Sequence, residues 1–198
     1  DPCTQVILIA FCFGAFFEGT AGFGSPVAVT AALLMQLDFK PLMACGLALI
    51  ANTAPVAFGA MGTPLIALNG VTGIPIEELS KMAGRQLPFF SVLVPFWVVG
   101  ALAGWRGVRS SWATALTAGL AFAIPQFLIS NFHGPWLVDI VSSIVSIIAV
   151  VILLKRRQRG GEAPPPDQHP ARFLCWTPWL ILTAVVFIWS LPRVKKGL

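Results

Sequence analysis

Residues 18–26 read Glu-Gly-Thr-Ala-Gly-Phe-Gly-Ser-Pro and interrupt an otherwise apolar run. Three glycines and a proline within nine residues disfavour a continuous helix. The apolar segments on either side, 6–17 and 27–37, contain only 12 and 11 residues, which is too short to span a bilayer alone. A carboxylate is costly in lipid, so we expect this backbone to line a cavity or to be covered by protein.

The composition indicates a membrane protein. Of the 198 residues, 57% are hydrophobic and 11% are charged, and the mean hydropathy is +0.83. So few charges could not cover the surface of a soluble domain of this length. The net charge of +5 comes from cations between apolar segments and not from one basic patch, so we do not expect a nucleic-acid partner. The cysteines lack CxxC spacing and the two histidines are isolated, so we expect neither a metal nor a cofactor.

The rest of the chain predicts ordinary membrane-spanning helices. Four apolar stretches have the length of one span: 87–104, 112–130, 137–154 and 173–191. Only Asp139 interrupts them with charge, and we interpret it as an interfacial residue. The basic and proline-rich stretch 155–172 predicts a cytoplasmic loop by the positive-inside rule. Because residues 5–68 predict discontinuous or re-entrant helices, the expected fold is an all-α polytopic membrane protein, with residues 1–198 forming part of one transport domain.

A second interrupted region supports a binding site. Asn52-Thr-Ala-Pro55 and Gly59–Pro64 cut the apolar segment 42–68, and Ala57-Phe-Gly59 echoes Gly22-Phe-Gly24. Ser-Pro, Thr-Pro and Asn-Thr-Ala-Pro patterns predict helix starts, and a helix start inside a membrane offers free N–H groups to an organic anion. The substrate-binding candidates are therefore Gly22, Gly24, Ser25, Asn52, Thr53, Thr63 and Asn131, the last of which ends an apolar run. The alternative is close helix packing or a simple proline kink.

Glu18 is the candidate proton-coupling residue. A partly desolvated carboxylate favours its protonated form, so it could take up a proton together with an anionic substrate. The alternative is a loop residue that reaches the interface. Thr20, His133 and Arg85 are secondary candidates, and for His133 and Arg85 an exposed loop or helix entrance is the simpler interpretation.

The stretch Phe11–Leu34 resembles the signature region of the L-lactate permease family. The resemblance continues through Asn52–Gly62, Gly84–Phe89, Gly104–Gly107, Asn131 and Trp176–Leu182. It implies a bacterial inner-membrane carrier that moves lactate, and often glycolate, together with a proton. It also implies that this chain is a fragment of a longer carrier, in which an inverted repeat would complete the site. Thr20 and Ser25 depart from the family pattern, where alanine is usual.

The leading hypothesis is a multi-pass symporter whose partners are a small carboxylate, a proton and the lipid bilayer. The alternative is a Na⁺-coupled carrier of another carboxylate. A channel would need a continuous polar stripe, which the spans 87–104 and 173–191 lack. An enzyme would need a nucleophile and base or a metal-ligand motif such as HExxH or GxSxG, and the sequence contains neither.

Overall fold

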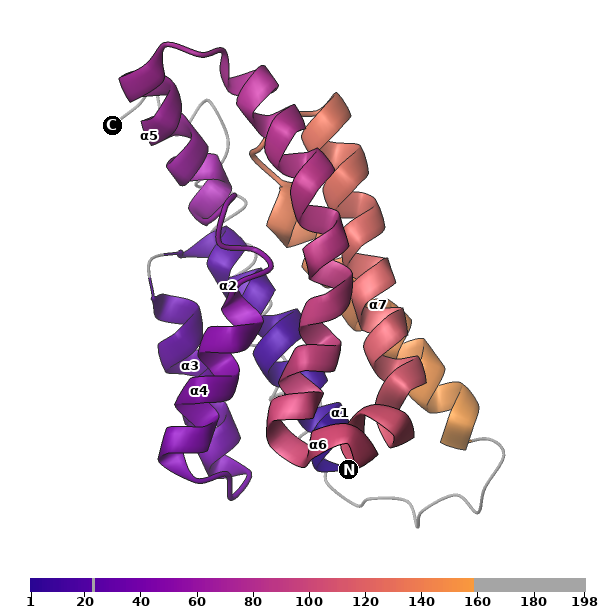
Figure 1. The fold of residues 1–198 in the computed structure, drawn as a ribbon. Helices are drawn as coiled ribbons and strands as arrows, with labels where there is room; N and C mark the ends of the chain where they lie inside the picture. The colour runs from indigo at the N-terminus through magenta and orange to yellow at the C-terminus, as the bar shows by residue number, and fades with distance from the viewer. Residues whose placement is uncertain (23, 159–198) are drawn as a thin grey trace, which may run out of the picture. The chain divides into compact units, whose positions relative to one another are not determined.

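The computed structural model describes residues 1–22 and 24–158, and all the regular secondary structure in them is helical (Figure 1). This confirms the predicted all-α class for the described part of the chain. The predicted span 173–191 and most of the predicted loop 155–172 lie outside the described residues.

The N-terminal segment is one long helix. It consists of α1 (Pro2–Val6), the π-helical η1 (Ile7–Phe13) and α2 (Gly14–Thr20). Together they give 19 residues, or about 28 Å at 1.5 Å per residue, which is enough to cross the hydrocarbon core. The expectation that 6–17 is too short to span is therefore wrong, because the helix starts four residues earlier and continues through Glu18.

Both ends of this helix have local support. Asp1 accepts a hydrogen bond from the Cys3 backbone N–H at 3.2 Å, which caps the start. At the other end the Thr20 hydroxyl donates to the Phe16 carbonyl at 3.0 Å, one turn back. The helix thus ends at Thr20. The interruption before α3 therefore covers residues 21–24, a shorter stretch than the predicted 18–26.

Three short helices follow. α3 (Ser25–Gln36) and α4 (Pro41–Asn52) have 12 residues each and lie side by side as an antiparallel pair (Figure 1). At about 18 Å each, neither can cross the hydrocarbon core alone. A second interruption at 53–62, which includes the 3₁₀ turn η2 (Ala60–Gly62), leads into α5 (Thr63–Thr72). Both interruptions fall within the ranges that the sequence predicts to be broken.

The helix α6 (Ile76–Phe132) is a hairpin with two long arms. It reverses at Gly104, where φ is 62° and ψ is −162°. The arms are joined by hydrogen bonds from the Ser80 hydroxyl to the Ser130 carbonyl, at 2.8 Å, and from the Ser91 hydroxyl to Gln126 Oε1, at 2.7 Å. The predicted spans 87–104 and 112–130 lie on these two arms, and Gly104 makes the reversal without a loop between them.

The last described helix is α7 (Val138–Gln158). It covers the predicted span 137–154 except for its first residue and continues for one more turn through Lys155–Arg157, so the predicted loop begins later than expected. Arginine and lysine suit this position, because cations interact favourably with the C-terminal end of a helix.

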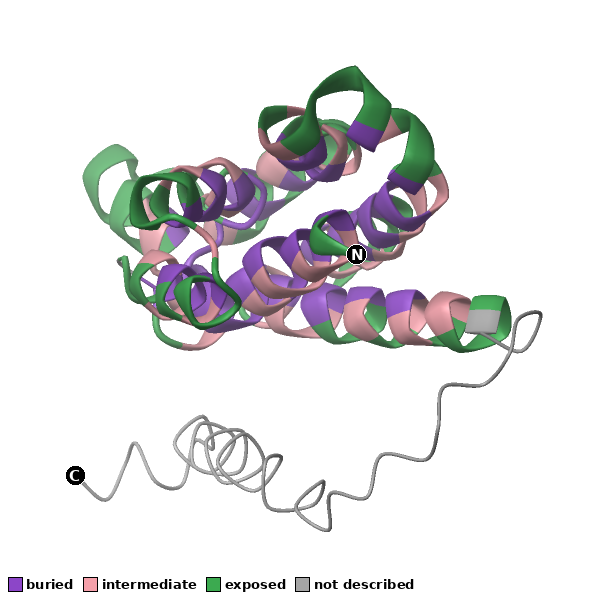
Figure 2. Ribbon diagram, turned by 90° about the horizontal axis from the view of Figure 1, so that it is seen from below, coloured by how far each residue is buried: buried purple, intermediate pink, exposed green. Residues whose placement is uncertain are grey.

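The 2–20 helix occupies the centre of the packed residues. Within its most hydrophobic stretch of 18 residues about 67% is buried inside the protein. The corresponding shares are 28% for α6 and 33% for α7. Phe11 of this helix packs edge-on against Phe122 of α6, with ring centroids 5.3 Å apart. Figure 2 shows buried residues where the helices face one another and exposed residues on the outward faces, as a lipid-facing surface requires. Glu18 is thus carried on the most enclosed of these three helices.

We predict that the α6 hairpin depends on Gly119. A Cβ added at Gly119 would lie 2.9 Å from the backbone of Val92 on the other arm, whereas one added at Gly46 in α4 meets nothing within 4 Å. Gly119→Ala should therefore lower the free energy of unfolding by about 1–3 kcal/mol. The matched control Gly46→Ala gains the same helix propensity without the clash, so it should be neutral or slightly stabilising. Thermal unfolding of the complete carrier in detergent measures both, and equal melting temperatures would contradict the packing.

Candidate functional site

A cavity of about 160 Å³ lies where the interrupted segments meet. Its lining comes from the end of α2, the first interruption, the end of α4, the second interruption and the start of α5. The lining residues are Glu18, Gly24, Asn52, Val56, Gly59, Ala60 and Pro64. The volume suits a small ligand, since pockets for drug-sized molecules usually exceed 300 Å³. The two regions singled out in the sequence therefore form one site.

Close backbone contacts hold the two interruptions together. A Cβ at Gly22 would lie 2.9 Å from the Ala60 side chain, and one at Gly59 would lie 3.0 Å from the Pro64 ring. The Gly22 distance is too short for a side chain, and the Gly59 distance would require the Pro64 ring to shift. Both positions also have a positive φ, 61° and 49°, so glycine is strongly favoured at both. The repeated Gly/Phe pattern thus marks the place where two non-helical segments press against each other.

Glu18 is the charged residue of this cavity. It is only 4% exposed, and its carboxylate is hydrogen-bonded to the Asn52 side chain. Among the described residues no group bonds to its Oε2 atom or to Asn52 Oδ1. The pair therefore retains one carboxyl oxygen and one amide oxygen that could bind a proton or a substrate hydroxyl group.

The helix starts differ from the capping that the sequence suggests. Gly24 and Gly62 occupy the N-cap positions of α3 and α5, and neither helix has a side-chain cap. The Thr63 hydroxyl bonds to the Ala60 carbonyl instead, and the Ser25 side chain is exposed. The Ser25 N–H donates to the Gly22 carbonyl and the Thr63 N–H to the Ala60 carbonyl, and Pro26 and Pro64 have no N–H group. Each helix start thus keeps the positive end of its dipole but has fewer free donors for an anion than an ordinary first turn.

The hydroxyl groups of two further candidates, Thr53 and Thr20, donate to backbone carbonyls of their own helices. The Thr53 hydroxyl bonds to the Ile50 carbonyl at 2.7 Å, and Thr53 ends α4 without starting a helix. The Thr20 hydroxyl bonds to the carbonyls of Phe16 and Phe17. Neither threonine lines the cavity.

The candidates Arg85, Asn131 and His133 form a separate group. Arg85 Nε donates to Asn131 Oδ1 at 3.2 Å and joins the two arms of α6. Asn131 and the exposed His133 line a surface pocket of about 240 Å³.

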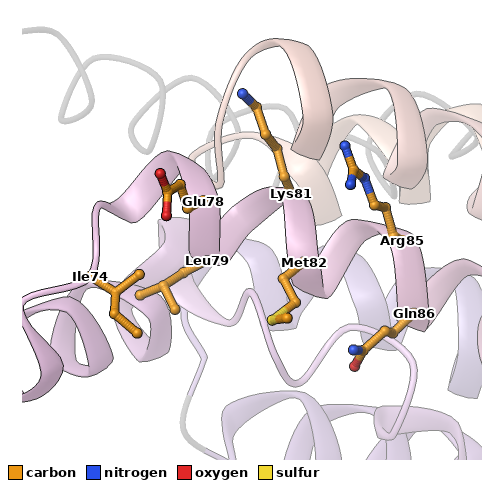
Figure 3. Close-up of a pocket in the computed structure, with 7 residues that line it drawn as sticks. All are labelled: Ile74, Glu78, Leu79, Lys81, Met82, Arg85 and Gln86. Atoms are coloured by element: carbon orange, nitrogen blue, oxygen red, sulfur yellow. The ribbon is translucent and has the colours of Figure 1, made fainter.

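Arg85 also borders an open pocket of about 530 Å³, where Lys81 and Arg85 extend from the same side of the helix (Figure 3). Its lining is Ile74, Glu78, Leu79, Lys81, Met82, Arg85 and Gln86. Neither pocket shares a lining residue with the cavity around Glu18.

Asp139, interpreted from the sequence as an interfacial residue, is buried among the described residues. It is 3% exposed, and neither carboxyl oxygen has a hydrogen-bond partner in the described structure. Its position in the first turn of α7 favours a negative charge by about 0.3–1 kcal/mol, but burying an ion costs several kcal/mol. The cost of removing the charged carboxylate from water therefore exceeds the stabilisation by the helix dipole. The sequence feature that could have drawn attention to Asp139 is that it alone interrupts the predicted spans with charge.

Gln126 is a second residue that sequence reasoning missed. It is fully buried, donates from Nε2 to the Ala54 carbonyl at 3.3 Å and accepts from the Ser91 hydroxyl at 2.7 Å. It thus ties the second interruption to both arms of α6. The lone amide within the predicted span 112–130 was the available signal.

The described residues contain no group of three His, Cys, Asp or Glu side chains that could hold a metal ion. The chemistry available at the cavity is therefore proton binding by Glu18 and hydrogen bonding by Asn52 and by the helix starts. These groups can recognise a small anion without forming or breaking a covalent bond.

Comparison with known proteins gives consistent matches. The family profile for L-lactate permease matches residues 1–198. The chain is 50% identical to an L-lactate permease of Escherichia coli (strain K12), 47% to the glycolate permease GlcA of the same strain and 45% to an L-lactate permease of Bacillus subtilis (strain 168). These alignments cover 98%, 98% and 100% of this chain but only 38%, 39% and 39% of the relatives. The chain thus spans about two fifths of the length of these curated relatives. No solved structure matches it.

We predict that Gln126 holds the second interruption in place. Gln126→Leu keeps the volume but leaves the Ala54 carbonyl and the Ser91 hydroxyl without their partner, at an expected cost of about 1–3 kcal/mol. Gln86→Leu, at an exposed position of the same helix, is the control and should change stability by less than about 0.5 kcal/mol. Thermal unfolding of the purified carrier compares the two variants. Equal stabilities would show that the Gln126 hydrogen bonds contribute nothing.

Proposed function

Because the chain belongs to the L-lactate permease family, we propose that it forms part of a secondary carrier for L-lactate, glycolate or a related 2-hydroxy acid, driven by proton symport. The observation that carries this proposal is the cavity at which Glu18, Asn52 and two uncapped helix starts converge. The relatives named L-lactate permease and glycolate permease support the substrate class. Members of this family transport their substrates, so we assign the chain to transport and not to an enzymatic reaction.

The carboxylate of the substrate would be bound by backbone N–H groups at the starts of α3 and α5. These donors lie at the positive end of the helix dipole, and no side chain caps either helix, so the anion would use the first-turn N–H groups that are not already bonded to backbone carbonyls. Asn52 lines the same cavity and offers its amide oxygen to the hydroxyl group of a 2-hydroxy acid. The site thus recognises both functional groups that lactate and glycolate share.

Glu18 would couple the substrate to a proton. Two like charges about 4 Å apart repel each other by about 4 kcal/mol at an effective dielectric constant near 20. An ionised Glu18 would therefore oppose entry of the substrate anion, and protonation removes that repulsion. Binding of the proton and binding of the anion favour each other, which is the requirement for symport.

The hydrophobic helices support a location of this site within a bilayer. The helices 2–20, α6 and α7 are each long and apolar enough to cross a membrane. With relatives from E. coli and B. subtilis, the proposed location is the bacterial plasma membrane, with several spans in the complete carrier.

We predict that Glu18→Gln uncouples transport from the proton. Glutamine keeps the size and the hydrogen-bonding ability of a protonated glutamate but cannot release a proton. In proteoliposomes that contain the complete carrier, accumulation of lactate driven by a proton gradient should be lost, whereas exchange of lactate for lactate should persist. Glu77→Gln, an exposed change of the same kind, should retain both activities.

Unchanged accumulation by Glu18→Gln would exclude Glu18 as the coupling residue. Accumulation that follows a Na⁺ gradient in the wild-type carrier would favour the alternative, a Na⁺-coupled carboxylate carrier.

We predict that Asn52→Asp weakens substrate binding. The substitution is nearly isosteric and adds a negative charge to the lining of the cavity, so the KM for lactate exchange at neutral pH should rise about tenfold or more. Asn69→Asp makes the same chemical change in α5 outside the cavity lining and should leave the KM unchanged. The concentration dependence of exchange gives both values. An unaltered KM for Asn52→Asp would place the substrate elsewhere.

A further inference from the structure

Asp139 is a buried carboxyl group for which the proposed function has no role so far. It is 97% buried, and both of its oxygens lack a hydrogen-bond partner among the described residues. The Ser142 hydroxyl, one turn further along α7, is fully buried and equally unpartnered. Residues three apart share one helix face, so this face of α7 carries two polar groups without a protein partner. Buried polar groups in native structures normally have hydrogen-bond partners. The unpartnered Asp139 carboxyl and Ser142 hydroxyl groups therefore indicate a position at which a ligand binds.

The helix that carries Glu18 packs directly against Asp139. A Cβ added at Gly19 would lie 2.9 Å from the Asp139 Cβ atom, so only a glycine allows the two helices to come this close. Glu18, the neighbour of Gly19, acts electrostatically on Asp139. The two carboxyl groups thus lie on adjoining helices, one lining the cavity and the other behind it.

No cation compensates this pair within the described chain. Glu18 is the charged group that faces Asp139 from α2, and α7 carries no further titratable side chain before Lys155 at its other end. His133, before the connection to α7, is exposed. Two ionised carboxylates at this separation and depth would be strongly unfavourable, so at least one of them must hold a proton.

The close packing favours a proton over a metal ion as the ligand. A Na⁺ ion needs several oxygen ligands around a space of its own size, whereas the Gly19 contact leaves Asp139 tightly packed against α2. A proton needs no additional space. The Ser142 hydroxyl could accept a hydrogen bond from the protonated carboxyl group or donate one to the ionised form.

We propose that Asp139 is a second proton-binding carboxyl group of the carrier, coupled to Glu18 across the Gly19 contact. This inference rests on the proposed proton symport and adds a residue to it. The pair keeps at least one proton at all times. The two carboxyl groups share this proton: Asp139 is ionised while Glu18 is protonated, and Asp139 is protonated when Glu18 is ionised, so the site never carries two adjacent negative charges.

The pH dependence of lactate uptake tests this coupling in the complete carrier. An ionised Asp139 would keep Glu18 protonated to higher pH, so Asp139→Asn should move the midpoint of the uptake profile to lower pH by about one unit or more. Asp38→Asn is the matched control, because Asp38 is exposed in the connection between α3 and α4. Its profile should coincide with that of the wild type. An unchanged midpoint in Asp139→Asn would overturn the proposal.

A measurement on carriers with an intact Asp139 covers the case in which Asp139→Asn does not fold. Infrared spectra with isotope-labelled aspartate detect protonated aspartic acid directly. The wild type should show such a group, and Glu18→Gln should change the pH at which its signal disappears. Absence of the signal, or a signal insensitive to Glu18→Gln, would overturn the role of Asp139. Wild-type uptake that ignores the proton gradient would instead overturn proton symport itself, and with it this role.

Discussion

Backbone N–H and C=O groups inside a bilayer have no water to bind, and this constraint governs how the chain is arranged. Helices satisfy it by themselves, but the interruptions at 21–24 and 53–62 cannot. They are instead packed against each other and against neighbouring helices. Gln126 bonds to the Ala54 carbonyl, and Gly62 lies so close to Pro135 that a Cβ would come within 2.9 Å of it. Enclosing irregular backbone in this way also keeps its unpaired N–H and C=O groups away from lipid, where they can bind a ligand.

The same enclosure surrounds the two buried carboxyl groups, Glu18 and Asp139. A buried charge is expensive, so Glu18 and Asp139 would not persist at these positions for stability alone. In the proposed symport their cost is acceptable, because the site alternates between protonated and ionised states and visits the expensive state only during turnover. Stability and coupling are then linked, since the free energy that opposes a buried charge would also make proton and anion bind together.

Much of this could be read from the sequence, but the limits have physical causes. Apolar length located the helices, and the Gly/Pro pattern located both interruptions. Glu18 was assigned to the break because local propensity cannot show that tertiary packing extends a helix through it. Gly24 and Gly62, and not Ser25 and Thr63, hold the cap positions, since the positive φ needed there outweighs a hydroxyl acceptor.

The sequence also located Asp139 without identifying its neighbour. A periodic pattern shows that a charge lies on a helix, whereas its proximity to Glu18 depends on how two helices far apart in the chain pack. The pairing of Gln126 with Ala54 escapes prediction for the same reason. Secondary structure follows from local composition, while the site is made by contacts between distant segments.

Among the described residues, the cavity lining contains no lysine or arginine, which bears on how a carrier of this kind would release its substrate. Lys40, Lys81 and Arg85 border other pockets. A buried ion pair with an anion would hold it firmly, and transport requires binding that can be reversed on either side of the membrane. Backbone N–H groups supply only partial charges, and the proton on Glu18 cancels a repulsion without adding a fixed attraction. In the proposed symport, affinity then depends on whether that proton is present, so a site of this composition would bind the anion when loaded with the proton and release both once the proton leaves.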